Sequence, residues 1–296
     1  MQVPFNAMKC CSVPAKVLLI GEYSVLWGGE GVCSAVKPRF SAERASLSSF
    51  HPESPAGRLA IDSHQPVRFF DPFNGAGGMG GSTAEYLCVW TLAGLENDIQ
   101  KIWKTYREHS CLEVLPSGVD LVTQFMGGTV AFQIKTESRF EASTVSFPKE
   151  WFSRFLLFSV THRTNRKVKT HEHLSFLEQK NLNSDAIVYE SQLIIDLWKT
   201  ALEKKDEFLF KKVTQEFISI LKAFGLESSE SKKDIEVLSK IPGVIVAKGC
   251  GALMNDVFWV FLESDAPVGQ IIEEIERLDF KLVLNGFSVE SGVETK

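Results

Sequence analysis

Five of the seven residues from Gly75 to Gly81 are glycines, and this run constrains the chain more than any other segment. After it, Ser82 and Thr83 open a stretch in which apolar residues recur at helical spacing as far as Leu95. The pattern predicts a helix that begins where the glycines end. Glycines let the backbone aim several N–H groups at one point, and a helix start adds unpaired N–H groups and a positive dipole end. The segment therefore predicts a phosphate-binding loop.

The hydroxyl groups beside the glycines extend this prediction to a nucleotide and its metal. Ser82 or Thr83 is placed to offer an oxygen to a magnesium ion. The residues predicted to bind the nucleotide are Gly75, Gly77, Gly78, Gly80, Gly81, Ser82 and Thr83. The alternative is a surface loop closed by a serine N-cap, although such loops seldom lead straight into so regular a helix.

Two other phosphate-binding folds share parts of this pattern. The run contains G-x-G-x-x-G, the dinucleotide fingerprint, which needs an acidic residue at the end of the next strand. Glu96 and Asp98 lie at about the right distance, but they follow the helix with no strand between, so this alternative is weak. The G-x-x-x-x-G-K-[ST] pattern of the P-loop fold is absent.

Composition narrows the class of protein. The chain has 296 residues, 44% hydrophobic and 23% charged, which is ordinary for one or two globular domains. Its formal net charge of −5 disfavours nucleic acid as a partner. The six cysteines form no C-x-x-C pair, and the longest early apolar run, 17–20, is too short for a signal peptide or a membrane span. We therefore expect a cytoplasmic protein with reduced thiols and no membrane partner.

The hydrophobic periodicity predicts an α+β fold in two parts. A strand or two is expected within 31–47, a hairpin or loop at 48–66, and a short helix before Gly127. A change of composition at 135–150 suggests the boundary between domains 1–150 and 151–296. Further strands are expected at 16–20, 67–70, 155–160, 244–247, 257–262 and 280–284, and helices at 82–95, 98–109, 182–204, 207–224 and 268–278.

Two charged residues outside the glycine run are candidates for chemistry. Asp120, in the segment Pro-Ser-Gly-Val-Asp, is suited to accept the proton of an attacking hydroxyl. Lys16, shortly before Glu22 and Tyr23, is suited to steady an alkoxide and a transferring phosphoryl group. Taken singly, an aspartate in a turn and a solvated lysine at a strand start are the commoner interpretations.

A basic segment follows the strand expected at 155–160. Arg163, Arg166, Lys167 and Lys169 are suited to bind a carboxylate or phosphate, and a solvated basic loop is at least as probable. His171 and His173 nearby lack the spacing of a metal pair on a helix, so no zinc site is predicted.

Three segments in this order resemble the GHMP kinases, a family that includes galactokinase, homoserine kinase, mevalonate kinase and phosphomevalonate kinase. PAKVLLIGEYSVLWGG at 14–29 is similar to the family's opening strand and turn, and is the most specific of the three. GAGGMGGSTAEY at 75–86 looks like its phosphate loop, and KGCGALMND at 248–256 lies where its C-terminal glycine loop is expected. PSGVDLVTQFMGG at 116–128 adds the segment that carries the family's aspartate.

The resemblance implies an ATP- and Mg²⁺-dependent kinase with two domains. The N-terminal, ATP-binding domain would be ribosomal-protein-S5-domain-2-like and the C-terminal domain ferredoxin-like. Asp120 would be the base and Lys16 its electrostatic partner. Ser82 would bind magnesium, together with a glutamate about a dozen residues before the aspartate, where Glu108 stands. The residues implied for the substrate are Glu22, Tyr23, Ser117 and Gly251.

The resemblance also narrows the substrate. Gly-Glu-Tyr followed by Ser-Val-Leu looks like phosphomevalonate kinases, whereas Pro-Ser-Gly-Val-Asp looks like mevalonate kinases. We therefore expect a kinase of the mevalonate (isoprenoid) pathway that acts on one of these two small molecules, as a monomer or a homodimer. Galactokinase is disfavoured because its N-terminal sugar-recognition signature is missing.

Two departures from the family pattern leave alternatives open. Gly81 replaces a serine, and Leu253, Met254 and Asn255 stand where the third motif usually has glycines. A catalytically weakened relative that binds a metabolite is one alternative. A decarboxylase resembling mevalonate diphosphate decarboxylase is the other.

Overall fold

The computed structural model describes residues 9–75, 77–111, 115–160, 183–250 and 257–295. The chain divides into two compact units. The first unit comprises residues 1–17, 32–144 and 289–296, and the second comprises 18–31 and 145–288. Each unit is described by itself.

The first unit is built on a six-stranded sheet. Its strands follow the order β10-β1-β2-β4-β5, and β3 pairs with the end of β2. The pairs β1–β10, β2–β3 and β4–β5 are antiparallel. The strands are β1 (Cys10–Ile20), β2 (Glu30–Arg44), β3 (Val67–Phe70), β4 (Thr129–Thr136), β5 (Arg139–Thr144) and β10 (Glu294–Thr295).

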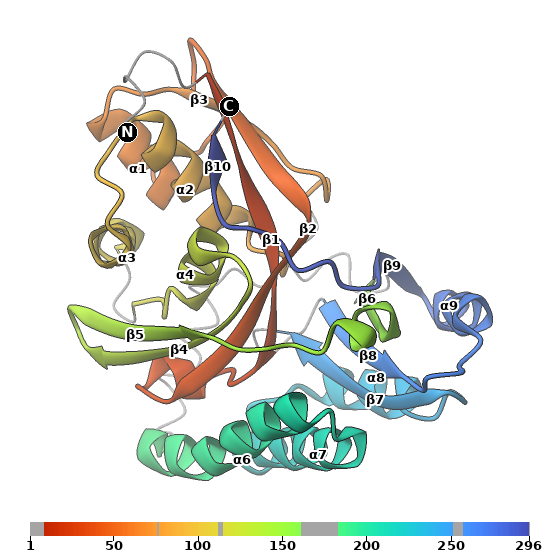
Figure 1. Cartoon of the computed structure of the whole chain (residues 1–296). Coiled ribbons are helices and arrows are strands. Elements are labelled where there is room, and N and C mark those ends of the chain that lie inside the picture. Colours follow the sequence, from red (N-terminus) through yellow and green to blue (C-terminus); the bar gives the residue numbers. More distant parts are fainter. Residues whose placement is uncertain (1–8, 76, 112–114, 161–182, 251–256, 296) are drawn as a thin grey trace. The chain divides into compact units, whose positions relative to one another are not determined.

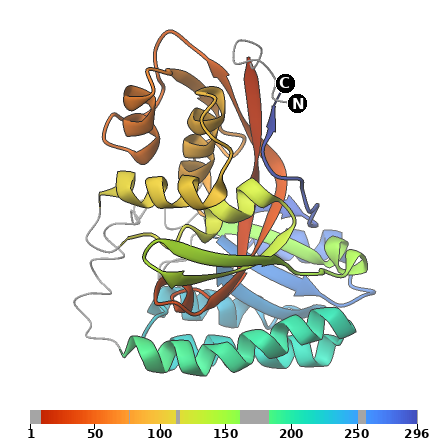
Figure 2. The same ribbon diagram turned by 60° about the vertical axis from the view of Figure 1, so that its left-hand side comes forward.

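Four helices lie together on one side of this sheet (Figures 1 and 2). Two of them begin at side-chain caps that accept hydrogen bonds from first-turn N–H groups: Ser54 accepts from Gly57 before α1, and Asp98 accepts from Gln100 before α3. Proline at the first position of α1 also fits a helix start. The helices are α1 (Pro55–Asp62), α2 (Gly81–Leu92), α3 (Ile99–Ser110) and α4 (Val119–Met126).

The second unit contains a four-stranded antiparallel sheet of order β7-β8-β6-β9. Strand β8 is buried along its whole length, so both faces of the sheet are covered. That explains its unbroken apolar sequence, because a strand with one wet face alternates instead. The strands are β6 (Phe155–Val160), β7 (Val244–Cys250), β8 (Val257–Leu262) and β9 (Phe280–Asn285).

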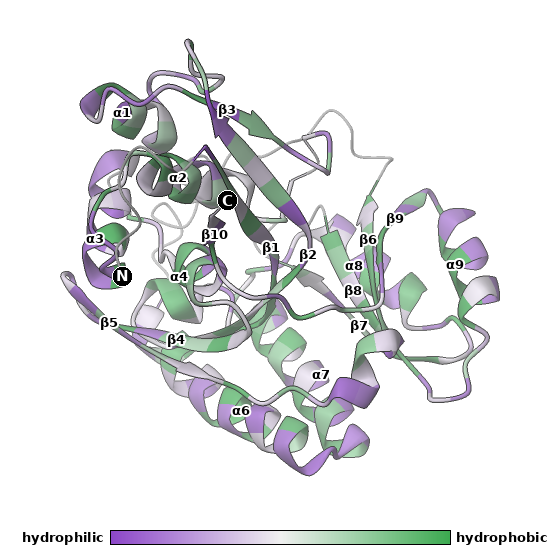
Figure 3. Ribbon diagram, turned by 45° about the horizontal axis from the view of Figure 1, so that its top comes forward, coloured by the Kyte–Doolittle hydropathy of each residue, from purple (hydrophilic) through white to green (hydrophobic). Residues whose placement is uncertain are grey.

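Helices cover the two faces of this sheet with different side chains. One face packs on aliphatic residues of α8 (Ser229–Leu238) and α9 (Val268–Glu276). The other face is aromatic. The ring centroid of Phe261 lies 4.7 Å from that of Phe155, with the rings tilted, and 5.2 Å from that of Phe210 in α7 (Glu207–Ala223). Helix α6 (Ser184–Lys204) packs on α7 and alternates between polar and apolar residues (Figure 3). Two short 3₁₀ helices, Ser24–Leu26 and Lys149–Arg154, complete this unit.

Most of the predicted elements are confirmed within a few residues at their ends. The strands at 67–70, 155–160 and 257–262 match β3, β6 and β8, and the helix expected from Ser82 begins at Gly81. Residues 31–47 contain one long strand, β2, rather than two. The loop predicted at 48–66 was wrong in part, because α1 lies inside it. This helix is too short for its periodicity to stand out between serine- and proline-rich flanks. No helix was predicted where α8 lies.

In the described parts of the chain, no helix is both long and apolar enough to cross a membrane.

Arg39 connects the C-terminal segment to the rest of the first unit, and its substitution tests the stability of the protein. Its guanidinium donates to the carbonyl oxygens of Ser12 (3.0 Å), Ser291 (2.9 Å) and Gly292 (2.6 Å). We expect Arg39→Met to lower the free energy of unfolding by about 1–3 kcal/mol, because three carbonyl oxygens, two of them partly buried, lose a charged donor. Urea denaturation measures this.

Lys37→Met is the matched control. Nζ of Lys37 lies 3.6 Å from Oε1 of Glu290, but the Lys37 side chain is 63% exposed. Its loss should therefore change the free energy of unfolding by less than about 1 kcal/mol. Equal effects of the two substitutions would contradict the role given to Arg39.

Candidate active site

Helix α2 begins at the glycine-rich run without any side chain to cap it. Its N-cap residue is Gly80, which has a φ of 85° and makes no side-chain cap. The first-turn N–H groups of Gly81, Ser82 and Thr83 therefore have no side-chain acceptor from the N-cap. An uncapped start with a positive dipole end is an arrangement that favours an anion.

Lys16 and Asp120 form an ion pair beside this helix start. Lys16 Nζ lies 2.8 Å from Asp120 Oδ2, and their side chains are 8% and 30% exposed. Lys16 comes from β1, and its backbone N–H donates to the carbonyl of Met79 in the glycine-rich run at 3.1 Å. The first unit thus brings together the two residues predicted to be catalytic and attaches them to the predicted phosphate loop.

The contact between these elements requires glycine at position 80. A Cβ atom there would lie 2.7 Å from Cγ of Lys16 and 2.8 Å from Nε2 of Gln124, and the positive φ adds strain for any other residue. The loop, β1 and α4 therefore meet at one backbone position.

Of the two hydroxyls proposed for magnesium, one points into the unit and the other stays at the surface. Thr83 is 4% exposed, and its hydroxyl lies 3.0 Å from the Gly80 carbonyl and 2.5 Å from Oε1 of Gln124. Ser82 is exposed. The side chain of Thr83 thus belongs to the packing behind the loop, and the Ser82 hydroxyl is the one open to a ligand.

Tyr106 of α3 faces the helix start, although sequence reasoning did not select it. Its side chain is buried and shares a hydrogen bond with Ser82. Burial raises the pKa of the Tyr106 phenol well above its ordinary value, and the charge of Asp120 raises it further. The phenol therefore stays protonated at neutral pH.

Glu108, predicted as a magnesium ligand, makes a different contact on the same helix. Its side chain is 59% exposed and lies 3.8 Å from Lys104, one turn away. Residues 106 and 108 of a helix point in different directions, so the one facing Ser82 is the tyrosine. A metal-binding role for Glu108 gains no support from this geometry.

Ser117 and Gly118 shape the turn that leads to Asp120. Ser117 is buried, and its carbonyl accepts a hydrogen bond of 2.7 Å from Nε1 of Trp103. Gly118 has a φ of 76°, and a Cβ there would lie 2.4 Å from the Trp103 ring. The turn places Asp120 in the first turn of α4, where the helix dipole favours a carboxylate.

Glu22 and Tyr23, predicted to bind substrate, belong to the second unit, where both are buried. Glu22 forms an ion pair with Lys248, and the two side chains are 3% and 2% exposed. Lys248 also donates to the carbonyl of Gly249 at 2.9 Å. Burial raises the pKa of Tyr23 well above its ordinary value, with further contributions from the charges of Glu22 and Glu227. The Glu22 carboxylate is thus neutralised by a lysine of its own unit.

Several predicted residues lie outside the described part of the chain. These are Gly251, the third-motif residues Leu253, Met254 and Asn255, and the basic and histidine residues Arg163, Arg166, Lys167, Lys169, His171 and His173.

Glu85, the carboxylate of α2, has an unusual environment that sequence reasoning missed. Burial raises the pKa of Glu85 to about 7, and the nearby charge of Asp71 contributes. The Asp71 carboxylate accepts hydrogen bonds from two N–H groups of the loop that follows it, those of Phe73 (2.8 Å) and Gly75 (2.7 Å). Asp71 thus anchors the start of the glycine-rich run.

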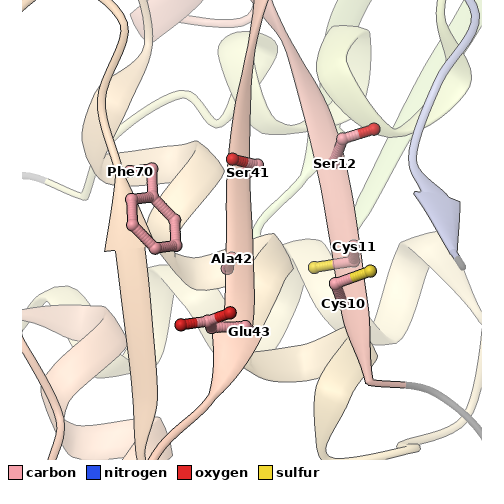
Figure 4. A pocket seen from close by; sticks show the side chains of 7 residues that line it. All are labelled: Cys10, Cys11, Ser12, Ser41, Ala42, Glu43 and Phe70. Atoms are coloured by element: carbon pink, nitrogen blue, oxygen red, sulfur yellow. The ribbon is translucent and has the colours of Figure 1, made fainter.

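A hollow of about 270 Å³ on the sheet of the first unit is a separate feature (Figure 4). None of the predicted site residues lines it. Among the described residues that line it, Glu43 is the only charged one, and none of them offers a cation for a phosphate. The lining residues are Cys10, Cys11, Ser12, Ser41, Ala42, Glu43 and Phe70.

Comparisons with known proteins place this geometry in a fold family. No family model matches the sequence, and no curated protein matches it. Among solved structures, the phosphomevalonate kinase of Streptococcus pneumoniae is similar with a TM-score of 0.71 and 15% identity, over 98% of this chain and 99% of that one. The mevalonate kinase of Methanococcus jannaschii has a TM-score of 0.70 and 16% identity, over 95% and 98%. The chain has the GHMP-kinase fold.

The galactokinase of Lactococcus lactis, a further member of the GHMP kinases, is similar over 99% of this chain and 96% of that one, with a TM-score of 0.69 and 12% identity. The resemblance inferred from the three motifs is therefore confirmed as a fold. The mixed architecture of helices and two sheets is confirmed as well. The finer description of the two domains as ribosomal-protein-S5-domain-2-like and ferredoxin-like stays a prediction.

The buried pair of Glu22 and Lys248 gives a test of stability. Lys248→Met leaves a buried carboxylate without its cation, and we expect a loss of about 3–5 kcal/mol in the free energy of unfolding. The double variant Glu22→Gln with Lys248→Met removes both charges and should be more stable than Lys248→Met alone. Urea denaturation measures both. A double variant no more stable than the single one would contradict the pairing.

The raised pKa of Glu85 predicts how stability depends on pH. An unfolded chain releases the Glu85 proton at its ordinary pKa of about 4.5, whereas the folded chain holds it to about 7. Stability is therefore lost as pH rises between these values and stays lower above them. Glu85→Gln removes this loss, so the melting temperature of the variant relative to wild type should be higher at pH 8 than at pH 5. A difference that does not change with pH would refute the environment described for Glu85.

Proposed function

We propose that this chain is an ATP-dependent phosphotransferase that moves the γ-phosphoryl group to an oxygen of a small molecule. The observation that carries the proposal is the Lys16–Asp120 pair, held at 2.8 Å and attached through Met79 to the uncapped start of α2. A base, a cation and a phosphate-binding helix start are the groups that phosphoryl transfer to a hydroxyl requires. The GHMP-kinase fold supports this combination.

In this proposal, each group has one task. The first-turn N–H groups of α2 bind phosphate oxygens, and the glycines let the backbone approach them closely. Asp120 accepts the proton of the attacking hydroxyl. Lys16 offsets the negative charge that develops on that oxygen and on the transferring group.

Magnesium fits this arrangement through one residue in particular. The Ser82 hydroxyl is exposed at the helix start and is the group that would hold the ion. When bound, magnesium neutralises charge on the phosphates. Glu108 is the other ligand proposed from the sequence, and it would have to leave Lys104 to reach an ion.

The proposed acceptor is mevalonate or phosphomevalonate. The motif Gly-Glu-Tyr at 21–23 and the segment 116–120 support this pair of substrates. Two solved neighbours were captured with such molecules: the mevalonate kinase of L. major with R-mevalonate, and the S. pneumoniae enzyme with phosphomevalonate and AMPPNP. At 13% and 16% identity these neighbours support the substrate class without deciding the acceptor. Action in the cytoplasm as a monomer or a homodimer is part of the proposal.

A coupled ADP-release assay tests the acceptor directly. Mevalonate, phosphomevalonate, homoserine and galactose are offered separately with Mg-ATP. We expect turnover with mevalonate or phosphomevalonate at least tenfold above the others. Measurable Mg-ATP binding without turnover of any acceptor would contradict the proposal and favour a relative that binds a metabolite without reacting it.

Asp120→Asn tests the proposed base. Asparagine keeps the shape of the side chain but cannot take the proton, so kcat should fall by about 10²–10⁴-fold while the Kd for Mg-ATP changes little. Asp98→Asn is the matched control, because asparagine caps a helix about as well as aspartate and Asp98 only caps α3. An Asp120→Asn variant with normal kcat would remove Asp120 from the mechanism.

A further inference from the structure

Gln124 connects every element that carries the proposed chemistry in the first unit. It lies on α4, one turn after Asp120, and its side chain is 0% exposed. Its amide nitrogen donates to the carbonyls of Pro14 (2.7 Å) and Gly80 (3.1 Å). Its amide oxygen lies 2.5 Å from the hydroxyl of Thr83. One side chain thus bridges β1, the glycine-rich run and the first turn of α2.

The partners of Gln124 allow only one orientation of its amide. The NH₂ group donates one hydrogen to each of these two carbonyl oxygens, and only a donor can face them. If the amide flipped, its oxygen would face the carbonyl oxygens of Pro14 and Gly80 in a buried place, and acceptors would stand against each other. The side chain is therefore fixed as a strut rather than free to adjust.

Each end of this strut lies next to a group with a proposed role. Pro14 is two residues before Lys16 on β1, and Gly80 is the N-cap of the helix start that would bind phosphate. Asp120 and Gln124 lie on one face of α4, because residues four apart in a helix are neighbours. Gln124 is fully buried and its amide contacts Pro14, Gly80 and Thr83, so its action on any reacting atom would be indirect.

We propose that Gln124 is a positioning residue, which sets the separation between the Lys16–Asp120 pair and the phosphate-binding start of α2. The inference rests on the proposed kinase function. In this role Gln124 governs kcat more than nucleotide affinity. Without Gln124 the first turn of α2 still forms, but the position of that turn relative to Asp120 changes. Misplacement of reacting groups by about 1 Å lowers rates by about 10²-fold.

Two substitutions separate the hydrogen bonds from simple packing. Gln124→Leu keeps much of the volume but removes the amide donor that Gln124 supplies to the carbonyls of Pro14 and Gly80. Gln124→Glu keeps the shape and places a carboxylate against them. We expect both to lower kcat by at least about tenfold while the Kd for ATP stays within about threefold of wild type.

Thr129→Val is the matched control for loss of a buried hydrogen bond. Thr129 lies in the same unit and shares a hydrogen bond of 2.6 Å with Ser34, and neither residue belongs to the proposed site. We expect this variant to lose thermal stability to a similar degree and to keep its kcat. If Gln124→Leu lowers kcat no more than Thr129→Val does, the positioning role is refuted.

Hydrogen exchange of the full chain tests the strut independently of turnover. The N–H of Ala84 donates to the carbonyl of Gly80 at 3.0 Å, so its exchange reports on the start of α2. The proposal predicts that the Ala84 N–H exchanges at least tenfold faster in Gln124→Leu than in Thr129→Val. Equal exchange in the two variants overturns the proposal. If the wild type phosphorylates no acceptor, the kinase function fails while this comparison still decides whether Gln124 positions the loop.

Discussion

Close contact of three backbone segments at Gly80 is the constraint on which the first unit depends. Lys16 of β1 and Gln124 of α4 both lie within 3 Å of the place where a side chain at position 80 would begin. Helix α2 must therefore start without a side-chain cap, so the N–H groups of its first turn have no acceptor from the N-cap residue. The need for glycine at position 80 thus leaves a helix start that favours an anion. It also lets β1 and α4, which carry Lys16 and Asp120, approach each other.

Charge is handled differently in the two units. In the first unit, Lys16 pairs with an aspartate that is 30% exposed, so the pair remains accessible to a ligand. In the second, Lys248 and Glu22 are both almost fully buried and neutralise each other. A buried pair of this kind contributes more to the specificity of folding than to reactivity. Its two residues belong to the segments 14–29 and 248–256, which only the sequence connects with substrate. Glu22 thus has a charge partner in its own unit, and its role in binding substrate stays a prediction.

The sequence predicted the elements and the reacting groups better than the groups that support them. The start of α2, the strands of the second unit and the residues Lys16 and Asp120 carry local signals, such as glycine runs, apolar periodicity and charge in a turn. Gln124 and Tyr106 carry none, because their importance comes from contacts across 44 and 24 residues of sequence, with Gly80 and Ser82. Glu85 was missed because its pKa depends on burial. Glu108 was chosen by its distance from Asp120, but helical rotation turns Tyr106 toward Ser82 instead.

Transfer of a γ-³²P label from ATP tests the central claim most directly. The protein is incubated with Mg-ATP and either mevalonate or phosphomevalonate, and the products are separated by chromatography. The account predicts label bound covalently to one of these acceptors, in amounts equal to the ADP formed, and none with Asp120→Asn. Label found only as free phosphate, or retained entirely in ATP, would contradict it.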